Sequence, residues 1–485
     1  ASLKEAFFIY YNMKKIIFTL ALSSILYSNN ITIAPIVYAN YESGGSTWSP
    51  EDKSIALGGW GFKVLGEFDK INIELDAYNN RFFGIKDKPN YFSDEQGLGW
   101  WGSDPGGDQR DFDVSNMKLS YSYNSLFFEF GKFTRHWGPG ESSLILSNKT
   151  PSFMQFGFNW ELNDNISFEY FHGSLRSLVD DNSNLEYYTQ VGQKVPELNR
   201  YIAAHRLNWD LTDRLSIGAS EAVVYGVRSI DLMYLLPFAP FLSLQQYLGD
   251  TDNIQWELDL KWSLNTNIDL YGAFLMDEWK PGLTFDKPNR NWFAYQFGII
   301  GNDLFISNDN FRFEFNWLDH RVYRHRFSIN DFYSHGYPLG FWGGPHSEQL
   351  FLNYTFYKYG MNFSLTYSDA KRGELTQQML QDQYDTKEYE RFSNISESIT
   401  EFEILVSKSI KNGFNIHFGI SLIDWENGNF DPFYVLNEGQ TIDGYSNSLI
   451  DVSKSSILIG FSQNFDIFKQ EAKLSDKSIK KTYSY

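Results

Sequence analysis

The chain contains no cysteine, and only 14 of its 485 residues are proline. Without cysteine, neither a disulfide framework nor thiolate chemistry is available. After the first 28 residues no apolar run approaches about eighteen residues, which excludes a transmembrane helix. Basic residues are outnumbered by acidic ones, with a net charge of −19. A chain that acidic does not wrap nucleic acid, so a nucleic-acid partner is excluded.

Aromatic residues, by contrast, are plentiful. They make up 18% of the chain, yet the mean hydropathy is only −0.39. This combination is too polar for a helical membrane protein and unusually aromatic for a soluble one. A transmembrane β-barrel reconciles the two, because its strands alternate lipid-facing apolar residues with polar lumen-facing ones and carry aromatic girdles at both interfaces.

The start of the chain resembles an export signal. Met13-Lys14-Lys15 precedes the apolar run Ile16–Leu26, after which small and polar residues follow. A basic segment, a short apolar segment and a small residue at the cleavage point are typical of a cleaved signal peptide. We expect cleavage after Ser28, with Ala39 as the alternative. The predicted organisation is therefore upstream residues and signal peptide at 1–28, a barrel at 29–465 and a charged periplasmic tail at 466–485.

Hydrophobic periodicity predicts strands that could cross a membrane. In 253–262, Asn253, Glu257 and Asp259 fall on one face, while Leu258 and other apolar residues fall on the opposite face. Alternation over nine or ten residues is about what a tilted strand needs to cross the hydrocarbon layer. The same pattern predicts eighteen strands, at 31–43, 55–67, 70–84, 113–123, 126–135, 152–162, 165–174, 199–210, 214–225, 253–264, 267–278, 291–301, 310–324, 348–358, 361–369, 398–410, 413–424 and 450–465.

The lengths of the connections separate a membrane barrel from a soluble sandwich. Every second connection is a tight turn, such as Asn124-Ser125 or Lys411-Asn412, with one longer link around 302–309. The others run from about eleven to almost thirty residues. This sorting predicts an all-β, antiparallel transmembrane barrel of about eighteen strands, with turns in the periplasm and loops outside. An even strand count places both termini on the periplasmic side.

Three long loops carry unusual sequence. The first, 135–148, contains a Gly-Pro-Gly bend and then an apolar triplet, so we expect it to fold inward and pack. The second contains the apolar stretch Tyr234–Leu244, which we expect to be buried as a short helix that closes the lumen. The third runs from His335 to Glu348.

These loops resemble the Wzi capsule assembly family of outer-membrane proteins, in layout from about residue 31 to 465. The matching stretches are His136–Asn148 (HWGPG, then SLILSN), Glu221–Pro237 with Gly249–Asn253, and Leu339–Leu350. The resemblance implies an eighteen-stranded barrel that acts as a surface lectin and helps to hold capsular polysaccharide on the cell. The best-known members also carry a periplasmic helical bundle, for which the segment before the first expected strand leaves no room.

Saccharide recognition needs planar polar groups for hydroxyls and aromatic faces for sugar rings, and the loop rim supplies both. The hypothesis of a saccharide site there rests on nine residues: Arg135, Trp137, Glu141, Asn148, Glu221, Arg228, Asp252, Asn253 and His335. A structural role for Trp137 and the Gly-Pro-Gly bend is favoured over ligand contact. The lumen charges, which are Glu257, Asp259, Lys261, Arg312 and Glu314, are expected to form an internal ion-pair network.

Enzymatic chemistry has weaker support. Ser142 or Ser143 with His136 could suggest a hydrolase, but no strained nucleophile elbow is present. The sequence therefore predicts no enzyme, no cofactor and no metal. His320 and His325 are expected on opposite faces of a strand, where they could not share a metal.

Two acidic stretches, near 108–113 and 250–253, could in principle hold calcium, but they lack the spacing of a known calcium loop, so solvated turns are favoured. The sequence predicts an outer-membrane location, with membrane lipid, lipopolysaccharide, surface polysaccharide and the barrel assembly machinery as partners. The alternative function is a porin-like diffusion channel, because eighteen strands can enclose an aqueous lumen. An adhesin or structural role is a third possibility.

Overall fold

The structure is a computed structural model. It describes residues 27–28, 31–84, 102–103, 109–183, 186–188, 192–284, 291–382, 389–410, 413–432 and 447–464. Most of the predicted signal peptide, the charged tail at 466–485 and the predicted turn at Lys411-Asn412 lie outside these residues.

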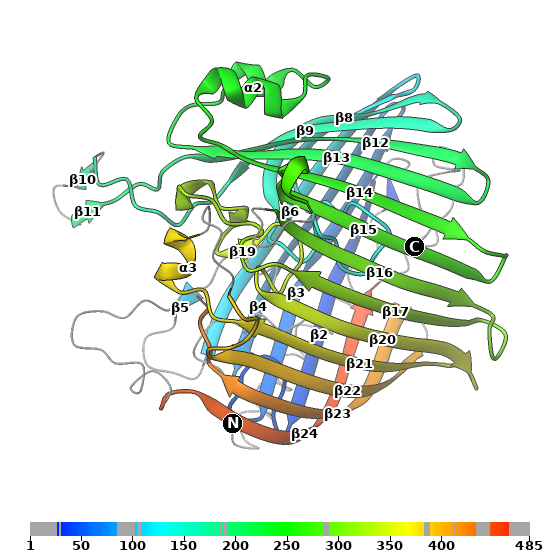
Figure 1. The fold of residues 1–485 in the computed structure, drawn as a ribbon. Coiled ribbons are helices and arrows are strands. Elements are labelled where there is room, and N and C mark those ends of the chain that lie inside the picture. The colour runs from blue at the N-terminus through cyan, green and yellow to red at the C-terminus, as the bar shows by residue number, and fades with distance from the viewer. Residues whose placement is uncertain are drawn as a thin grey trace.

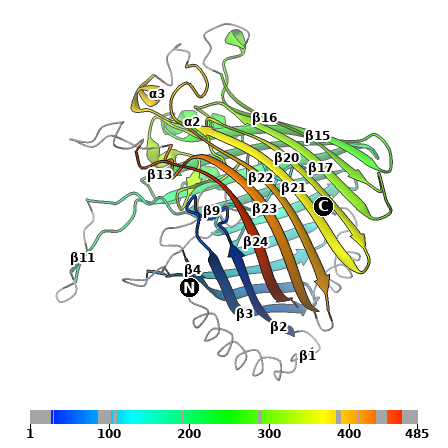
Figure 2. The same cartoon turned by 90° about the horizontal axis from the view of Figure 1, so that it is seen from below.

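Eighteen antiparallel strands form one closed barrel, which is drawn from two directions in Figures 1 and 2. Each strand pairs with the next along the chain, and β2 closes the wall by pairing with both β3 and β24. The barrel strands are β2 (Ile31–Ser43), β3 (Ile55–Phe68), β4 (Ile71–Phe83), β6 (Gln109–Tyr123), β7 (Leu126–Phe133), β8 (Phe153–Asn163), β9 (Ile166–Leu175), β12 (Arg200–Thr212), β13 (Leu215–Gly226), β14 (Asn253–Ser263), β15 (Ile268–Glu278), β16 (Trp292–Asn302), β17 (Asp309–Leu318), β20 (Ser347–Lys358), β21 (Met361–Gly373), β22 (Ser396–Ser409), β23 (Phe414–Gly428) and β24 (Ile450–Asn464).

The remaining elements are short and belong to the connections. They are the strands β1 (Tyr27–Ser28), β5 (Gly102–Ser103), β10 (Glu186–Tyr188), β11 (Gly192–Lys194), β18 (Tyr333–Ser334) and β19 (Tyr337–Pro338), and the helices η1 (Leu232–Leu235), α2 (Phe241–Leu248), η2 (Pro281–Leu283), η3 (Ser328–Asn330) and α3 (Gln377–Gln381). No helix among the described residues combines the length and the apolar character that crossing a membrane requires.

The two ends of the barrel differ as the connection lengths predict. At one end, here called the turn end, short links join the strands, such as the one at Asn124, whose φ of 54° suits a tight turn. The long connections gather at the opposite end, here called the loop end (Figure 1). Strand pairing places the start of β2 beside Gly66 and the end of β24 beside Ile36, so the first and last barrel strands begin and end at the turn end.

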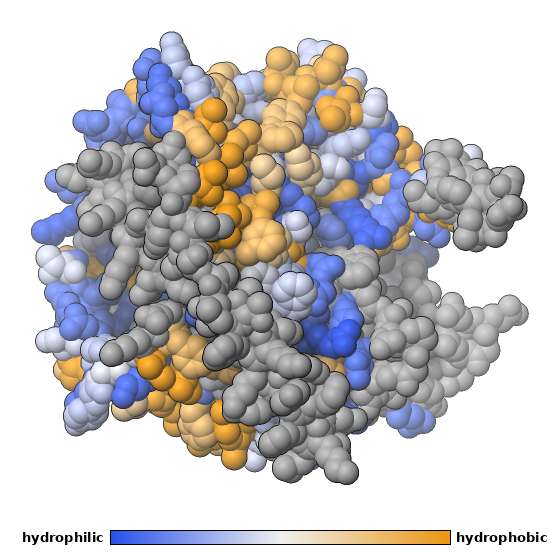
Figure 3. Space-filling model, turned by 180° about the vertical axis from the view of Figure 1, so that it is seen from behind, coloured by the Kyte–Doolittle hydropathy of each residue, from blue (hydrophilic) through white to orange (hydrophobic). Residues whose placement is uncertain are grey.

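The wall reverses the usual distribution of polarity in a protein. On β14, Glu257 is 1% exposed and points into the lumen, whereas its neighbour Leu258 is 49% exposed on the outside. Apolar side chains on the outer surface appear as orange patches in Figure 3. Apolar groups outside and charges inside are what a barrel surrounded by lipid requires.

Strand bounds agree closely with the predicted ranges, with one informative error. The range 310–324 was expected as one strand, but β17 ends at Leu318. The carboxylate of Asp319 then accepts hydrogen bonds from the backbone N–H and the guanidinium of Arg321. This local turn replaces the ladder, because an Asp side chain can satisfy the backbone two residues on. His320 and His325 are consequently loop residues, and the expectation that they lie on opposite faces of a strand is wrong.

Candidate functional site

Two loops fill the lumen near the loop end, and together they are called the lumen cap (residues 135–151 and 319–346). Their apolar side chains, including Leu144, Ile145 and Phe341, form one buried cluster with inward-facing residues of strands from β8 round to β24. The loops also bond to each other, with the N–H of Ser147 donating to the carbonyl of Leu339 at 2.8 Å. The prediction that the first loop folds inward and packs is confirmed.

The tip of the first loop is held by a carboxylate from the opposite wall. Glu314 of β17 accepts hydrogen bonds from the backbone N–H groups of Glu141 at 2.6 Å and Ser142 at 3.1 Å. Gln296 of β16 donates to the carbonyl of Ser142. The side chain of Glu141 in turn forms an ion pair with Arg312 at 2.9 Å. The tip therefore reaches across the lumen and is fastened to its far side.

The Gly-Pro-Gly bend and Trp137 contribute to the packing of the first cap loop. Trp137 is 4% exposed and packs edge-on against Phe171, while its indole N–H donates to Glu169 at 3.1 Å. Gly138 has a φ of +93°, and a Cβ on Gly140 would lie 2.4 Å from the backbone carbonyl oxygen of Ser142. Both positions therefore require glycine.

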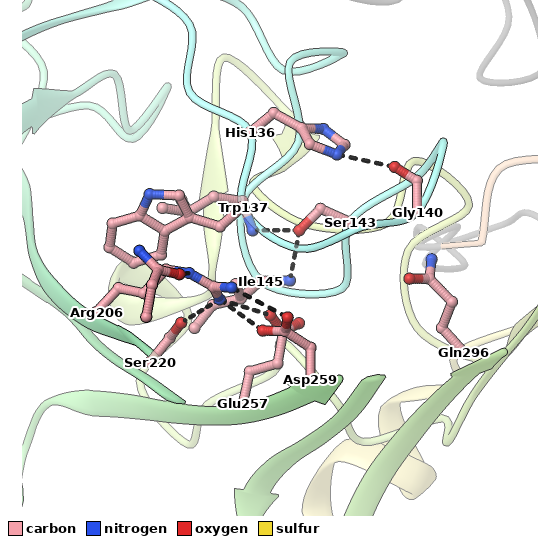
Figure 4. A network of polar contacts seen from close by, with 12 residues as sticks. His136, Trp137, Gly140, Ser143, Ile145, Arg206, Ser220, Glu257, Asp259 and Gln296 are labelled. Carbon is pink, nitrogen blue, oxygen red and sulfur yellow. Dashed lines mark hydrogen bonds and ion pairs between the residues drawn. The ribbon is translucent and has the colours of Figure 1, made fainter. Parts of the chain in front are cut away.

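Charged side chains below the cap form an internal network, shown in Figure 4. Arg206 of β12 makes a two-pronged contact with Asp259 at 2.6 and 3.0 Å, and its third nitrogen donates to Asn208. Glu257 lies 3.9 Å from the same guanidinium. Lys261 pairs with Asp269. With the contacts of Arg312 and Glu314 described above, all five predicted lumen charges lie in ion pairs or hydrogen bonds.

A cavity of about 500 Å³, lined by charged, amide and aromatic side chains, lies between the cap and the turn end. Arg135 and Trp137 line it, and the guanidinium of Arg135 is already paired with Glu129 at 2.8 Å and stacked on Phe171. Further lining residues are Asn72, Glu74, Lys118, Phe133, Asn159, Glu161, Asn208 and Lys261. Amides, carboxylates and aromatic edges of this kind could hold a small polar molecule.

Three of the predicted site residues lie on the outside of the barrel, away from this cavity. The connection between β13 and β14, residues 227–252 and here called the strap, packs against the outer wall (Figure 1). Beneath it, Glu221 accepts hydrogen bonds from the N–H groups of Phe241 and Leu242 at the start of α2. At the two ends of the strap, Arg228 pairs with Asp252 at 2.6 Å. The expectation that this segment closes the lumen is therefore wrong.

The remaining three predicted residues, Asn253, Asn148 and His335, lie apart from the residues under the strap. Asn253 is buried on the lumen side, where its amide oxygen accepts from Gln255. Asn148 is exposed and His335 is half-buried, both on the lumen cap. The His335 N–H donates to the carbonyl of Arg176, which brings a third loop against the cap. The nine residues thus form no single rim site: four lie along the first cap loop, three under or beside the strap, and two elsewhere at the loop end.

The candidate hydrolase residues have other partners. Ser142 and Ser143 are buried, and the Ser143 hydroxyl accepts hydrogen bonds from the N–H groups of Ile145 and Leu146. The ring of His136 bonds to the carbonyl of Gly140 at 2.9 Å. These contacts stabilise the loop rather than join the three residues. No cluster of three or more metal-ligating side chains occurs in the described part of the chain.

Burial changes the protonation of several cap residues. It lowers the pKa of His325 and of His346 to about 4, and it also lowers the pKa of His136. For Asp331, burial raises the pKa to about 6 even though Arg324 opposes the change. His136, His325 and His346 are therefore neutral at pH 7.

Sequence reasoning missed several residues that organise the lumen. Arg372 pairs with Glu397 at 2.8 Å, and the Glu397 carboxylate also accepts from the indole of Trp425. Tyr323 donates to the carbonyl of Leu144 and so links the two cap loops. The alternation of polar and apolar residues could have placed Glu397 and Arg372 in the lumen, because both alternate with outward-facing residues of their strands. Their pairing joins neighbouring strands whose register the sequence does not specify.

A closed barrel with an apolar belt outside, charges inside and loops packed into its lumen defines an outer-membrane β-barrel protein. The family model of the capsule assembly protein Wzi matches residues 65–433, about three quarters of the chain. The chain belongs to this Wzi family, and the resemblance seen in its loops is confirmed.

Several solved structures are similar to this chain, and the first of them has the same fold. Wzi of Escherichia coli, described as an outer membrane protein involved in group 1 capsule assembly and as a carbohydrate binding β-barrel, is 14% identical, with a TM-score of 0.54 over 88% of this chain and 83% of that one. OccAB2 of Acinetobacter baumannii is 10% identical, with a TM-score of 0.47 over 90% and 98% of the two chains. OprD of Pseudomonas aeruginosa is 10% identical, with a TM-score of 0.43 over 90% and 95%. A comparison with curated proteins gives no match.

Proposed function

We propose that this protein binds surface polysaccharide at the loop end of its barrel and helps to assemble or retain a capsule or exopolysaccharide layer. The observation that carries the proposal is the lumen cap, which packs into the lumen as a buried, hydrogen-bonded core. A barrel filled in this way offers a platform at its mouth. Membership of the Wzi family supports the same function. The proposal includes export with a cleaved signal peptide and insertion by the barrel assembly machinery.

The candidate binding surface is the exposed part of the lumen cap. Asn148 is exposed there and His335 is half-buried, and both belong to the residues that the sequence predicts as polysaccharide-binding. Arg326 and Phe327 add a guanidinium stacked on an aromatic ring, with 5.3 Å between the guanidinium carbon and the ring centroid. Planar polar groups beside an aromatic face match the hydroxyl and C–H surfaces of a sugar ring.

Binding of the purified barrel to a glycan array and to the capsular polysaccharide of its own cells tests this proposal. We expect Asn148→Ala combined with His335→Ala to weaken binding at least about tenfold, whereas Asn182→Ala, an exposed substitution on another loop, leaves binding unchanged. A deletion strain should shed its capsule into the medium. Full capsule retention in that strain would overturn the proposal.

The diffusion channel is the competing function, and planar-bilayer conductance distinguishes it. The filled lumen predicts a closed state without steady current. Large, steady single-channel currents from the intact protein would favour the channel, because ions would then pass a cap that the proposed function requires to stay in place.

A further inference from the structure

The strap has a composition unlike the rest of the chain. Its central part, residues 232–249, contains no Asp, Glu, Lys or Arg over eighteen residues, whereas 21% of the whole chain is charged. The ionised groups of the strap lie only at its ends, where Arg228 pairs with Asp252 and with Asp231. A segment in water has no need to exclude charge in this way.

The backbone of the strap is bonded to the wall beneath it. Glu221 satisfies the N–H groups of Phe241 and Leu242, His205 contacts the carbonyl of Pro237 at 3.0 Å, and the Tyr170 hydroxyl donates to the carbonyl of Tyr234 at 2.8 Å. Backbone groups in a lipid environment must find partners inside the protein, because hydrocarbon offers none. The wall supplies those partners.

The side of the strap that faces away from the wall is mostly apolar, with Ser243 and Gln246 as the exposed polar residues of α2. Tyr247 is 83% exposed, Leu232 75% and Phe238 61%. Phe238 also packs against outward-facing aromatics of the wall, with ring centroids 4.8 Å from Phe168 and 6.2 Å from Trp160. The exposed face of the strap is therefore continuous with the lipid-facing belt of the barrel.

We infer that the strap is embedded in the membrane leaflet at the loop end and that its outer face binds the acyl chains of that leaflet. The lipid-contacting element is thus a connection between two strands. Its helix α2 lies on the outer surface of the barrel wall. Its charged ends mark where the segment leaves the hydrocarbon. This inference rests on the barrel spanning a membrane and is independent of polysaccharide binding.

The absence of cysteine in the chain permits a direct test. Tyr247→Cys and Leu232→Cys are labelled with an environment-sensitive fluorophore in the full-length barrel, which is then reconstituted into phosphatidylcholine vesicles. Leu258→Cys, on the outer face of β14, is the lipid-facing control, and Asn182→Cys, on an exposed loop, is the water-facing control. Quenching by lipids that carry a nitroxide near the top of the acyl chain is compared with quenching by aqueous iodide.

We expect both strap positions to be quenched by the nitroxide lipid to at least half the extent of position 258, and by iodide at least threefold less than position 182. Iodide quenching that equals position 182 would overturn the inference, because the strap would then lie in water. Protection from both quenchers would also overturn it, because protein would then cover the strap. Excimer emission from pyrene at position 247 would identify that protein as a second copy.

Discussion

Substitution of Glu314 by Ala should release the tip of the first cap loop while the barrel stays intact. Glu314 is 1% exposed and accepts from the backbone N–H groups of Glu141 and Ser142. Each buried donor that loses its partner costs about 1–3 kcal/mol, so the two together cost about 2–6 kcal/mol. The substitution also removes the acceptor of the Tyr271 hydroxyl and of the Asn316 amide, whereas Gln296 keeps the Asn316 oxygen, which it contacts at 2.8 Å.

Hydrogen exchange of the two amides measures this cost directly. A loss of about 2 kcal/mol accelerates exchange of the amides of Glu141 and Ser142 by about thirtyfold, because 1.4 kcal/mol corresponds to a factor of ten. Glu314→Gln retains an acceptor oxygen and should fall between the parent and Glu314→Ala. Amides of β3 and β4, strands that do not pair with β17, should exchange at the parental rate.

Glu141→Gln is the matched control. It changes a half-exposed carboxylate at the same loop tip and removes the ion pair with Arg312, which is worth at most about 1 kcal/mol. The exchange rates of the amides of Glu141 and Ser142 should then stay within a few-fold of those in the parent. If the amides of Glu141 and Ser142 were as well protected from exchange in Glu314→Ala as in the parent, the carboxylate of Glu314 would not hold the loop tip. Another contact would then keep the tip in the lumen.

Four further outcomes follow from the same contacts. Leu144→Ala should destabilise the barrel by about 2–5 kcal/mol in urea titrations in lipid vesicles, because its side chain is wholly buried in the cap cluster and leaves a cavity; an unchanged midpoint would show that the cap closes over the gap. Glu221→Ala should detach the start of α2, seen as faster exchange at Phe241 and Leu242, while the amides of Glu141 and Ser142 keep the parental rate. Arg372→Met should cost about 3–5 kcal/mol, because it leaves the Glu397 carboxylate buried without its cation, and Arg372→Met with Glu397→Leu should recover most of that loss. The cap should lose stability as the pH falls from about 6.5 to 4, because the histidines of the unfolded chain gain protons in this range while His325 and His346, with pKa values of about 4, stay neutral until its lower limit. Each histidine contributes up to about 3 kcal/mol, and Asp331 opposes them with a similar amount because its pKa is raised in the folded protein. His346→Gln should therefore flatten the dependence of stability on pH.

The direction of the pH effect at His346 follows from its hydrogen bonds. One ring nitrogen contacts the carbonyl of Glu374 at 3.0 Å and so carries the proton, while the other accepts from the N–H of Phe392 at 3.1 Å. Protonation of His346 would place an N–H on the ring nitrogen that faces the N–H of Phe392, so two donors would oppose each other. Stability is therefore present above the unfolded pKa of about 6.5 and is lost as the pH falls through the folded value.

The sequence predicts the wall well, because the wall is governed by local rules. Alternation identifies which face of each strand meets lipid, and tight turns require residues such as Asn124 that tolerate a positive φ. The error at 310–324 arises because alternation continues past Leu318, while the side chain of Asp319 has already turned the backbone. Which residues meet across the lumen is a different matter. Glu141 and Glu314 are far apart in the sequence. No local pattern predicts that the loop tip at Glu141 contacts the strand that carries Glu314.

The strap shows why an apolar loop is ambiguous in a membrane protein. In a soluble protein an apolar segment such as 232–249 has one destination, the core, whereas in a barrel both the lumen and the lipid exclude water. The deciding evidence lies in the strand before the loop. Glu221 alternates in phase with Val223 and Tyr225 and pairs across the ladder with Trp256, whose face carries the apolar belt. A carboxylate on a lipid-facing surface needs a cover of hydrogen-bond donors, and for Glu221 the first N–H groups of α2 supply part of it, together with His205 and the indole of Trp256. The position of Glu221 on the outer face therefore requires the helix to lie outside the barrel.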